Sequence, residues 1–96
     1  MTELYLQNSS VEAAALQEET ILFDSKQNKF CMLNRTASFI WACLKSPASA
    51  EQVAAGLRAQ FEGVSDVQAI EDAETILNSL VSMGLVNSVS SGTVTA

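Results

Sequence analysis

Two short apolar runs lie close together in the first third of the chain, at residues 20–23 and 29–33. Both are rich in β-branched, aromatic and aliphatic side chains, and the polar stretch of residues 24–28 separates them. Runs of this kind on either side of a short polar loop are typical of an antiparallel β-hairpin. The pattern therefore predicts a hairpin as the clearest β-structure in the chain.

After the hairpin, apolar residues recur at helical spacing in three blocks that are separated by turn signals. Asn34 is a favourable N-cap for the first helix, and Pro47 prevents its extension. Ser49 caps the second helix with Gln52 at the capping-box position, and Gly63 ends it. The spacing thus predicts two short helices between residues 34 and 63.

The third helix is predicted to run from its N-cap Ser65 to Gly84, which favours the left-handed conformation that ends helices. Its predicted inward stripe consists of Val67, Ile70, Leu77, Leu80 and Val81. A second apolar flank beside that stripe holds Ala69, Ile76, Leu80 and Met83, with Asp72 at its edge. Ile76 and Met83 are therefore candidates for one wall of an exposed groove.

The segments outside these elements give weaker signals. Residues 11–16 are rich in alanine, and Ser9 with Glu12 imitates a capping box, so propensity alone favours a helix there. Residues 1–10 and 88–96 are polar and lack periodicity, which predicts a flexible tail at each end. The ordered domain is therefore expected to span residues 11–87.

Composition sets the size and class of this domain. The chain has 96 residues, which is enough for one domain, and 48% hydrophobic against 17% charged residues suffices for a small core. Two or three strands that lead into three short helices define a small α+β domain of winged-helix size.

The net charge of −6 is unevenly distributed. Four of the five basic residues lie between residues 24 and 51, and none follows Arg58. A negative field repels phosphate backbones and anionic lipid, which argues against binding of nucleic acid or membranes. No apolar run reaches the roughly 20 residues of a membrane span, and residues 1–10 lack the features of a signal peptide, so we expect a cytoplasmic location.

The side chains offer little catalytic chemistry. The chain contains no histidine, so the commonest general base and metal ligand is missing. Cys31 and Cys43 have no metal-binding spacing and no histidine to activate them. The acids Glu71, Asp72 and Glu74 have the spacing of a solvated helix face. We therefore expect a protein that is not an enzyme and that holds neither a cofactor nor a metal.

Three stretches of the chain form a distinctive succession, namely Thr20-Ile21-Leu22-Phe23-Asp24, then Lys29-Phe30-Cys31-Met32-Leu33-Asn34-Arg35-Thr36-Ala37, then Ile40-Trp41 and Leu44. Through this succession the chain resembles the PqqD family from about residue 11 to residue 87. The start of the second helix at Ser49 and the closing segment from Leu80 to Leu85 also fit the family pattern. The resemblance implies a winged-helix-like α+β fold with a three-stranded antiparallel sheet followed by three helices. Residues 11–16 should then form a strand despite their alanines.

The resemblance also implies a function, which is recognition of ribosomally made precursor peptides that are modified after translation. A domain of this kind is expected to bind the leader of the precursor as a non-catalytic peptide chaperone. It presents that leader to a modifying enzyme, such as a radical SAM protein, or to a leader peptidase. We expect neither nucleic acid nor a membrane among its partners.

The third strand of such a sheet has an open edge, and its free N–H and C=O groups can pair with an added strand. We expect the leader to lie antiparallel to residues 29–33, in a groove against the third helix. The candidate peptide-binding residues are Lys29, Phe30, Cys31, Met32 and Leu33 on the strand, and Asp72, Ile76 and Met83 on the helix. Both faces of the strand are apolar, so the sequence leaves open which face lines the groove. An open edge also allows two copies to pair as a homodimer.

Two other classes of protein have a similar size. A winged-helix DNA-binding regulator would place one helix in the major groove, but the third helix carries acids and no Lys or Arg. A small acidic carrier protein would need a serine in an Asp-Ser-Leu sequence at the start of a helix. The only Asp-Ser pair here, Asp24-Ser25, lies in the predicted hairpin loop.

Overall fold

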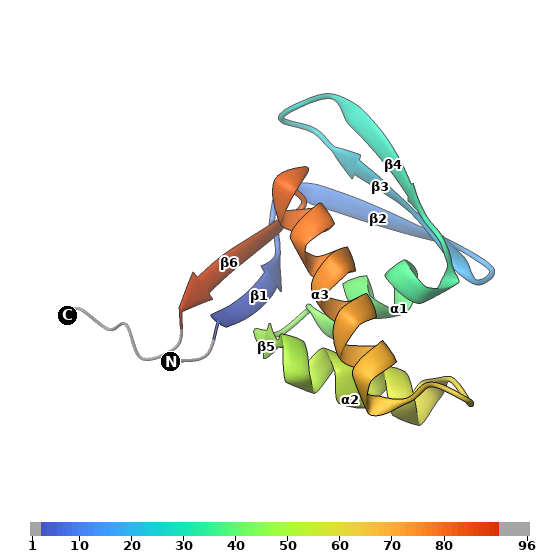
Figure 1. Ribbon diagram of the computed structural model, residues 1–96. Helices are drawn as coiled ribbons and strands as arrows, with labels where there is room; N and C mark the ends of the chain where they lie inside the picture. Colours follow the sequence, from blue (N-terminus) through green and yellow to red (C-terminus); the bar gives the residue numbers. More distant parts are fainter. Residues whose placement is uncertain (1–2, 91–96) are drawn as a thin grey trace.

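The computed structural model describes residues 3–90, which form two small antiparallel sheets and three helices (Figure 1). One sheet has the strand order β2-β3-β4 and the other has the order β5-β1-β6. The strands are β1 (Glu3–Gln7), β2 (Val11–Leu16), β3 (Glu19–Asp24), β4 (Lys29–Leu33), β5 (Ala48–Ser49) and β6 (Val86–Ser90). The helices are α1 (Arg35–Cys43), α2 (Ala50–Gln60) and α3 (Asp66–Ser82). The α+β class and the sheet that precedes the helices are as the sequence predicted.

The β2-β3-β4 sheet contains the predicted hairpin. β3 and β4 pair antiparallel with Leu22 opposite Cys31, and β2 pairs with the other side of β3 with Ala13 opposite Leu22. The alanine-rich segment is therefore a strand, as the family resemblance implied and helix propensity did not. Pairing with β3 supplies hydrogen bonds that an isolated segment lacks, and this tertiary context overrides the local preference.

The prediction of a flexible tail at residues 1–10 was wrong for β1. This strand lies between β5 and β6 and pairs Leu4 with Ser49 on one side and with Val89 on the other. Its Tyr5 is buried in the core. The tail predicted from residue 88 onward was also wrong for residues 88–90, which belong to β6. Residues 1–2 and 91–96 lie outside the described part of the chain.

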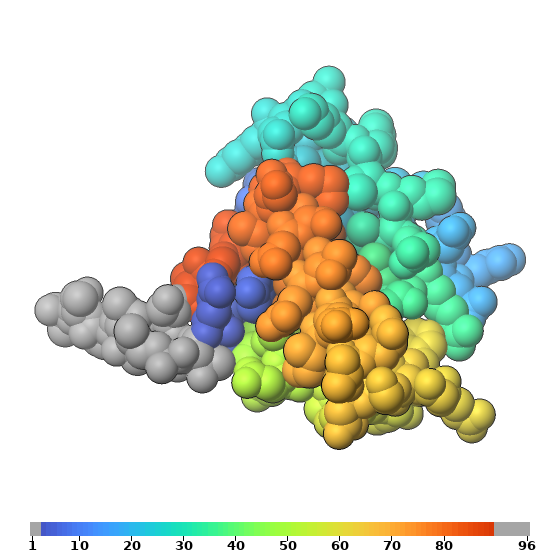
Figure 2. Space-filling model, in the orientation of Figure 1, coloured from blue at the N-terminus to red at the C-terminus, as the bar shows by residue number. Residues whose placement is uncertain are grey.

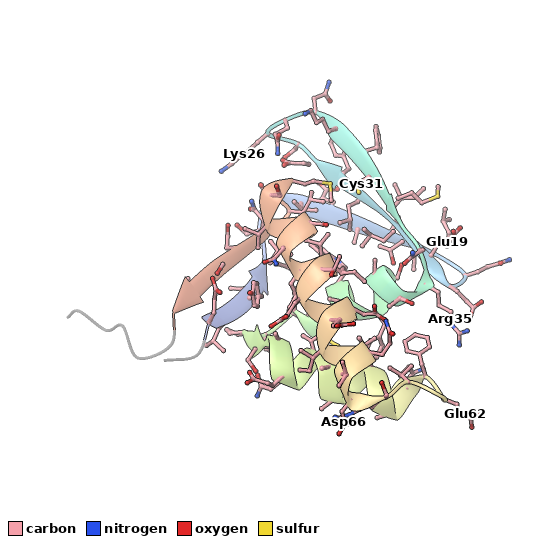
Figure 3. The ribbon with its side chains drawn as sticks, viewed as in Figure 1. Glu19, Lys26, Cys31, Arg35, Glu62 and Asp66 are labelled. Atoms are coloured by element: carbon pink, nitrogen blue, oxygen red, sulfur yellow. The ribbon has the colours of Figure 1, made fainter. Side chains whose placement is uncertain are left out.

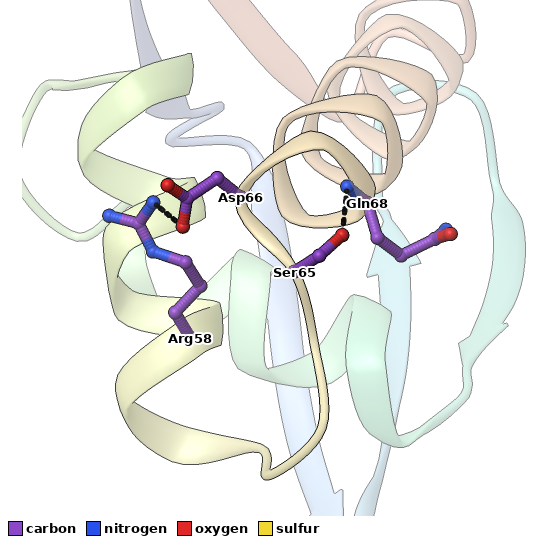
Figure 4. A network of polar contacts seen from close by, with 4 residues as sticks. All are labelled: Arg58, Ser65, Asp66 and Gln68. Carbon is purple, nitrogen blue, oxygen red and sulfur yellow. Dashed lines mark hydrogen bonds and ion pairs between the residues drawn. The ribbon is translucent and has the colours of Figure 1, made fainter.

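The helices begin where the sequence placed their caps. The side chain of Asn34 accepts a hydrogen bond from the backbone N–H of Ala37 at 2.9 Å, and Ser49 forms a reciprocal capping box with Gln52. Ser65 accepts a bond from the backbone N–H of Gln68 at 3.1 Å at the start of α3 (Figure 4). These contacts satisfy N–H groups that have no partner within the helix.

The core lies among the three helices, the inner face of the β2-β3-β4 sheet and the β5-β1-β6 sheet. Leu22 from β3, Ile40 from α1, Leu57 from α2 and Leu77 from α3 are fully buried there. The stripe that α3 buries consists of Ala69, Ala73, Leu77 and Leu80. Small residues in that stripe allow helices to approach closely, since packing follows side-chain size.

The predicted inward stripe of α3 was therefore only partly correct. Leu77 and Leu80 are buried, and Ile70 and Val81 are half-buried against the core. Val67 is 68% exposed, so it lies outside the stripe. The alanines carried too weak a hydrophobic signal to locate the buried face in the first turns of the helix.

Candidate functional site

The edge strand β4 is the centre of the candidate site. Within the described residues it pairs only with β3, so the peptide groups along its other side have no strand partner. The β3–β4 turn precedes β4, and α1 follows it after the single residue Asn34. An edge of this kind is a template for an added strand.

The side chains of β4 alternate between the two faces of the sheet, and the register with β3 shows which face meets the helices. Cys31 lies opposite the buried Leu22 and is half-buried, and Leu33 is buried. Phe30 and Met32 point to the other face, where they are 75% and 62% exposed. The inner face, which carries Cys31 and Leu33, is therefore the one that meets the helices.

The start of β4 and the end of α3 enclose a pocket of about 330 Å³. Its lining residues are Asp24, Gln27, Lys29, Phe30, Cys31, Ser82, Met83 and Leu85. The hairpin and the end of α3 touch on the face shown in Figure 2, and Cys31 is seen close to that end of the helix in Figure 3. A concave surface of this size, partly apolar, is typical of a binding site.

Four of the eight predicted site residues line this pocket, namely Lys29, Phe30, Cys31 and Met83. The other four lie outside its lining. Met32 is on the outer face of the sheet, and Leu33 belongs to the core. Ile76 is half-buried against the core, and Asp72 is half-buried on α3 and accepts a hydrogen bond from the side-chain Nε2 of Gln68 at 2.8 Å.

The sequence did not single out Asp24, although it is the most buried charged residue that lines the pocket, with 3% of its surface exposed. The hydrogen bond from the Gln27 side chain, at 2.7 Å, is the main cause that lowers the pKa of this carboxyl group. The backbone N–H groups of Lys26 and Gln27 also donate to it, at 3.0 and 3.4 Å. The signal in the sequence was an aspartate at the start of a turn, where its side chain commonly accepts from the following N–H groups.

Gln27 was also missed, and it joins the two walls of the pocket. Its Nε2 donates to the carbonyl oxygen of Met83 at 3.2 Å, in addition to its bond with Asp24. The next residue after Met83 is Gly84, with φ of +76°, and a Cβ atom there would lie 3.1 Å from the same Nε2. Glycine thus serves both the left-handed turn and the close approach of Gln27.

The two cysteines are free thiols. Burial raises the pKa of Cys43, so a smaller fraction of this thiol is present as the reactive thiolate. Within residues 3–90 no group of three or more His, Cys, Asp or Glu side chains is arranged to hold a metal ion. No helix in this part of the chain is long and apolar enough to cross a membrane.

A second, shallower pocket of about 240 Å³ lies at the opposite end of β4. There the guanidinium group of Arg35 pairs with Glu18, with 3.0 Å between Nε and Oε1, and lies 4.9 Å from the ring centre of Phe61. The ring of Phe61 in turn packs edge-on against Phe39. Because the guanidinium group of Arg35 already pairs with Glu18 and stacks on Phe61, this pocket has fewer free groups for a ligand than the first.

Comparison with solved structures shows the same fold in two proteins. One is TbiB1 in complex with the TbiA(beta) leader peptide, with a TM-score of 0.78 and 20% identity over 85% of this chain and 94% of that one. The other is lasso peptide synthetase B1 complexed with the leader peptide, with a TM-score of 0.74 and 24% identity over 86% of this chain and 96% of that one. No curated protein sequence gives a significant match.

The family comparison covers most of the domain. The model described as coenzyme PQQ synthesis protein D (PqqD) matches residues 19–86, from the start of β3 to the start of β6. This range includes the hairpin, all three helices and the pocket between β4 and α3. The chain therefore belongs to the PqqD family.

Proposed function

We propose that this protein binds the leader segment of a ribosomally made precursor peptide as a strand added to β4. The observation that carries the proposal is the open edge of β4 directly beside the pocket at the end of α3. Main-chain pairing along the edge supplies affinity, and a pocket for alternate side chains supplies specificity.

The structural neighbours support this reading. The solved structures of TbiB1 and of lasso peptide synthetase B1 both contain a leader peptide, and each covers most of the present chain. Membership of the PqqD family points the same way, because the family acts on precursor peptides together with modifying enzymes. The partners of this chain are accordingly a precursor leader and the enzyme that modifies or cleaves the precursor.

In this proposal the domain itself catalyses no step. The Cys31 thiol that lines the pocket has no histidine to activate it, since the chain contains none. The role of the domain is to hold one end of the substrate, while the chemistry takes place on the partner enzyme.

Electrostatics favour a peptide over the DNA-binding alternative. The helix α3 that borders the pocket carries Asp66, Glu71, Asp72 and Glu74 and no basic residue. In a DNA complex this helix would bring like charges against the phosphates, which costs affinity at every contact.

The direct test is a titration with the fluorescently labelled leader of a candidate precursor peptide, sought among the genes that neighbour this one, followed by anisotropy. We expect saturable binding, and we expect Met83→Asp to weaken it by about tenfold or more, because the charge enters the apolar part of the pocket. Val67→Asp is the matched control, since both residues are exposed apolar side chains of α3 and its C-cap but only Met83 lines the pocket.

Strand addition is tested by changing the leader peptide, so that the domain stays wild type and its folding is not affected. Proline placed at successive positions of the leader removes one N–H at a time and should abolish binding at alternating positions of the paired segment. A leader that does not bind, or one that tolerates proline throughout, would contradict the proposal.

A further inference from the structure

The pocket at the start of β4 combines an apolar surface with two ionisable side chains. Cys31, Met83 and Leu85 supply the apolar part, and Asp24 and Lys29 supply the charges. Asp24 and Lys29 lie directly opposite each other in the β3–β4 register. The state of these two charges determines what the pocket can recognise.

Both oxygens of the Asp24 carboxylate already accept hydrogen bonds from the turn. One oxygen accepts from the backbone N–H groups of Lys26 and Gln27, and the other accepts from the Gln27 side chain. These three donors use most of the roughly four acceptor positions of the carboxylate. Its charge fixes the turn, and it is not free to bind a cation of the leader.

Lys29 is in the opposite situation. This residue is exposed and lines the pocket, yet within residues 3–90 its side chain forms neither an ion pair nor a hydrogen bond. The two ion pairs of the described chain instead involve Arg35 and Arg58. An ammonium group with three donors and no partner favours a carboxylate.

The spacing of residues along β4 determines where in the leader sequence a partner for Lys29 must lie. Lys29 and Cys31 are two residues apart on the same face of the strand, and side chains of an added strand on that face also recur every second residue. In a leader that runs antiparallel to β4, the residue opposite Lys29 follows the residue opposite Cys31 by two positions. If an apolar side chain of the leader enters the pocket opposite Cys31, the leader residue two positions later therefore lies beside Lys29.

We propose, on the basis of the proposed function, that Lys29 selects a leader in which an apolar anchor is followed two residues later by Asp or Glu. The anchor fills the space between Cys31, Met83 and Leu85, and the acidic side chain pairs with the Lys29 ammonium group. Lys29 is thus a specificity-determining residue that selects the leader by charge, while the pocket selects it by the size of its apolar side chain.

The test is a charge-reversal cycle by fluorescence anisotropy with the leader of the same candidate precursor that tests the proposed function. Each acidic position of the leader is changed to Lys in turn and is titrated against the wild-type domain, Lys29→Glu and the control Lys45→Glu. Lys45 is exposed and outside the pocket lining, so this control changes the net charge equally.

We expect one acidic leader position, two residues after an apolar one, whose change to Lys weakens binding to the wild-type domain by about three- to tenfold, the range of a partly exposed ion pair that is reversed. Lys29→Glu should weaken the native leader similarly and restore binding of that one variant, whereas Lys45→Glu should do neither. Leader binding in which Lys29→Glu equals the wild type, or in which no acidic position couples to Lys29, would overturn this inference alone. A wild-type domain that does not bind the leader would instead contradict the proposed function.

Discussion

Gln27 and Met83 lie 56 residues apart in the chain, and the side-chain Nε2 of Gln27 donates a hydrogen bond to the carbonyl oxygen of Met83 at 3.2 Å. The same nitrogen donates to Asp24 at 2.7 Å. One side chain therefore holds the β3–β4 turn against the end of α3, and with it the two walls of the candidate pocket.

Gln27→Ala should loosen this junction. We expect the free energy of unfolding to fall by about 1 kcal/mol, because a hydrogen-bond donor to a carboxylate is lost. Leader affinity should fall as well, because the pocket walls are no longer held together. Urea denaturation and anisotropy titration measure the two effects.

Gln68→Ala is the matched control for that variant. Gln68 also donates from its Nε2 to an aspartate, Asp72, but this hydrogen bond is exposed to solvent and joins no second element to α3. Its loss should change the free energy of unfolding by less than about 0.5 kcal/mol. An equal effect of the two substitutions would contradict the role assigned to Gln27.

Asp24 should make stability dependent on pH in the acid range. The Gln27 side chain and the turn N–H groups lower the pKa of Asp24 in the folded state, below its ordinary value of 3.8. The folded state therefore binds this proton less readily than the unfolded state does. The stabilisation is fully present above about pH 4, the unfolded pKa, and is lost as the pH falls through the folded pKa.

Asp24→Asn removes this contribution, so the variant should be less stable than the wild type at pH 6 and the difference should shrink toward pH 2. Urea denaturation across this range checks the prediction. A difference that stays constant, or one that grows as the pH falls, would show that the ionised Asp24 does not stabilise the turn.

Tyr5→Ala tests the strand that the sequence missed. Tyr5 lies in β1 between β5 and β6 and is only 7% exposed, so we expect truncation to cost about 2–4 kcal/mol in the free energy of unfolding. Leu16→Ala is a suitable control because Leu16 is 48% exposed on the edge strand β2. If residues 3–7 were a tail, both variants would be as stable as the wild type.

Alkylation of the two thiols should report on the site. Burial raises the pKa of Cys43, which is outside the pocket lining, so its reaction with iodoacetamide at pH 7 should be slow with or without leader. Cys31 lines the pocket, and we expect bound leader to protect it from the reagent. Mass spectrometry of tryptic peptides separates the two sites, and an unprotected Cys31 in a saturated complex would place the leader elsewhere.

Much of the fold could be predicted from local signals. The β3–β4 hairpin follows from two short apolar runs around a polar loop, and the helix starts follow from Asn34, Ser49 and Ser65. Each of these features depends on residues within a few positions of one another, so the sequence contains the whole interaction. The small α+β domain follows from the same local signals, whereas the open edge at residues 29–33 was an expectation that came from the family resemblance.

The β5-β1-β6 sheet and the composition of the pocket were decided only in three dimensions. β1 gains its partners from residues 48–49 and 86–90, so neither the polar start of the chain nor the Ser-rich end gave a local sign of pairing. The inward face of β4 depended on its register with Leu22, because its alternate side chains are all apolar apart from Lys29. The contact between Gln27 and Met83 required α3 to end beside the hairpin turn. The sequence by itself determined the hairpin and the three helices, because these depend on interactions between neighbours in the chain. Long-range packing determined the second sheet and the side chains that meet at the edge of β4.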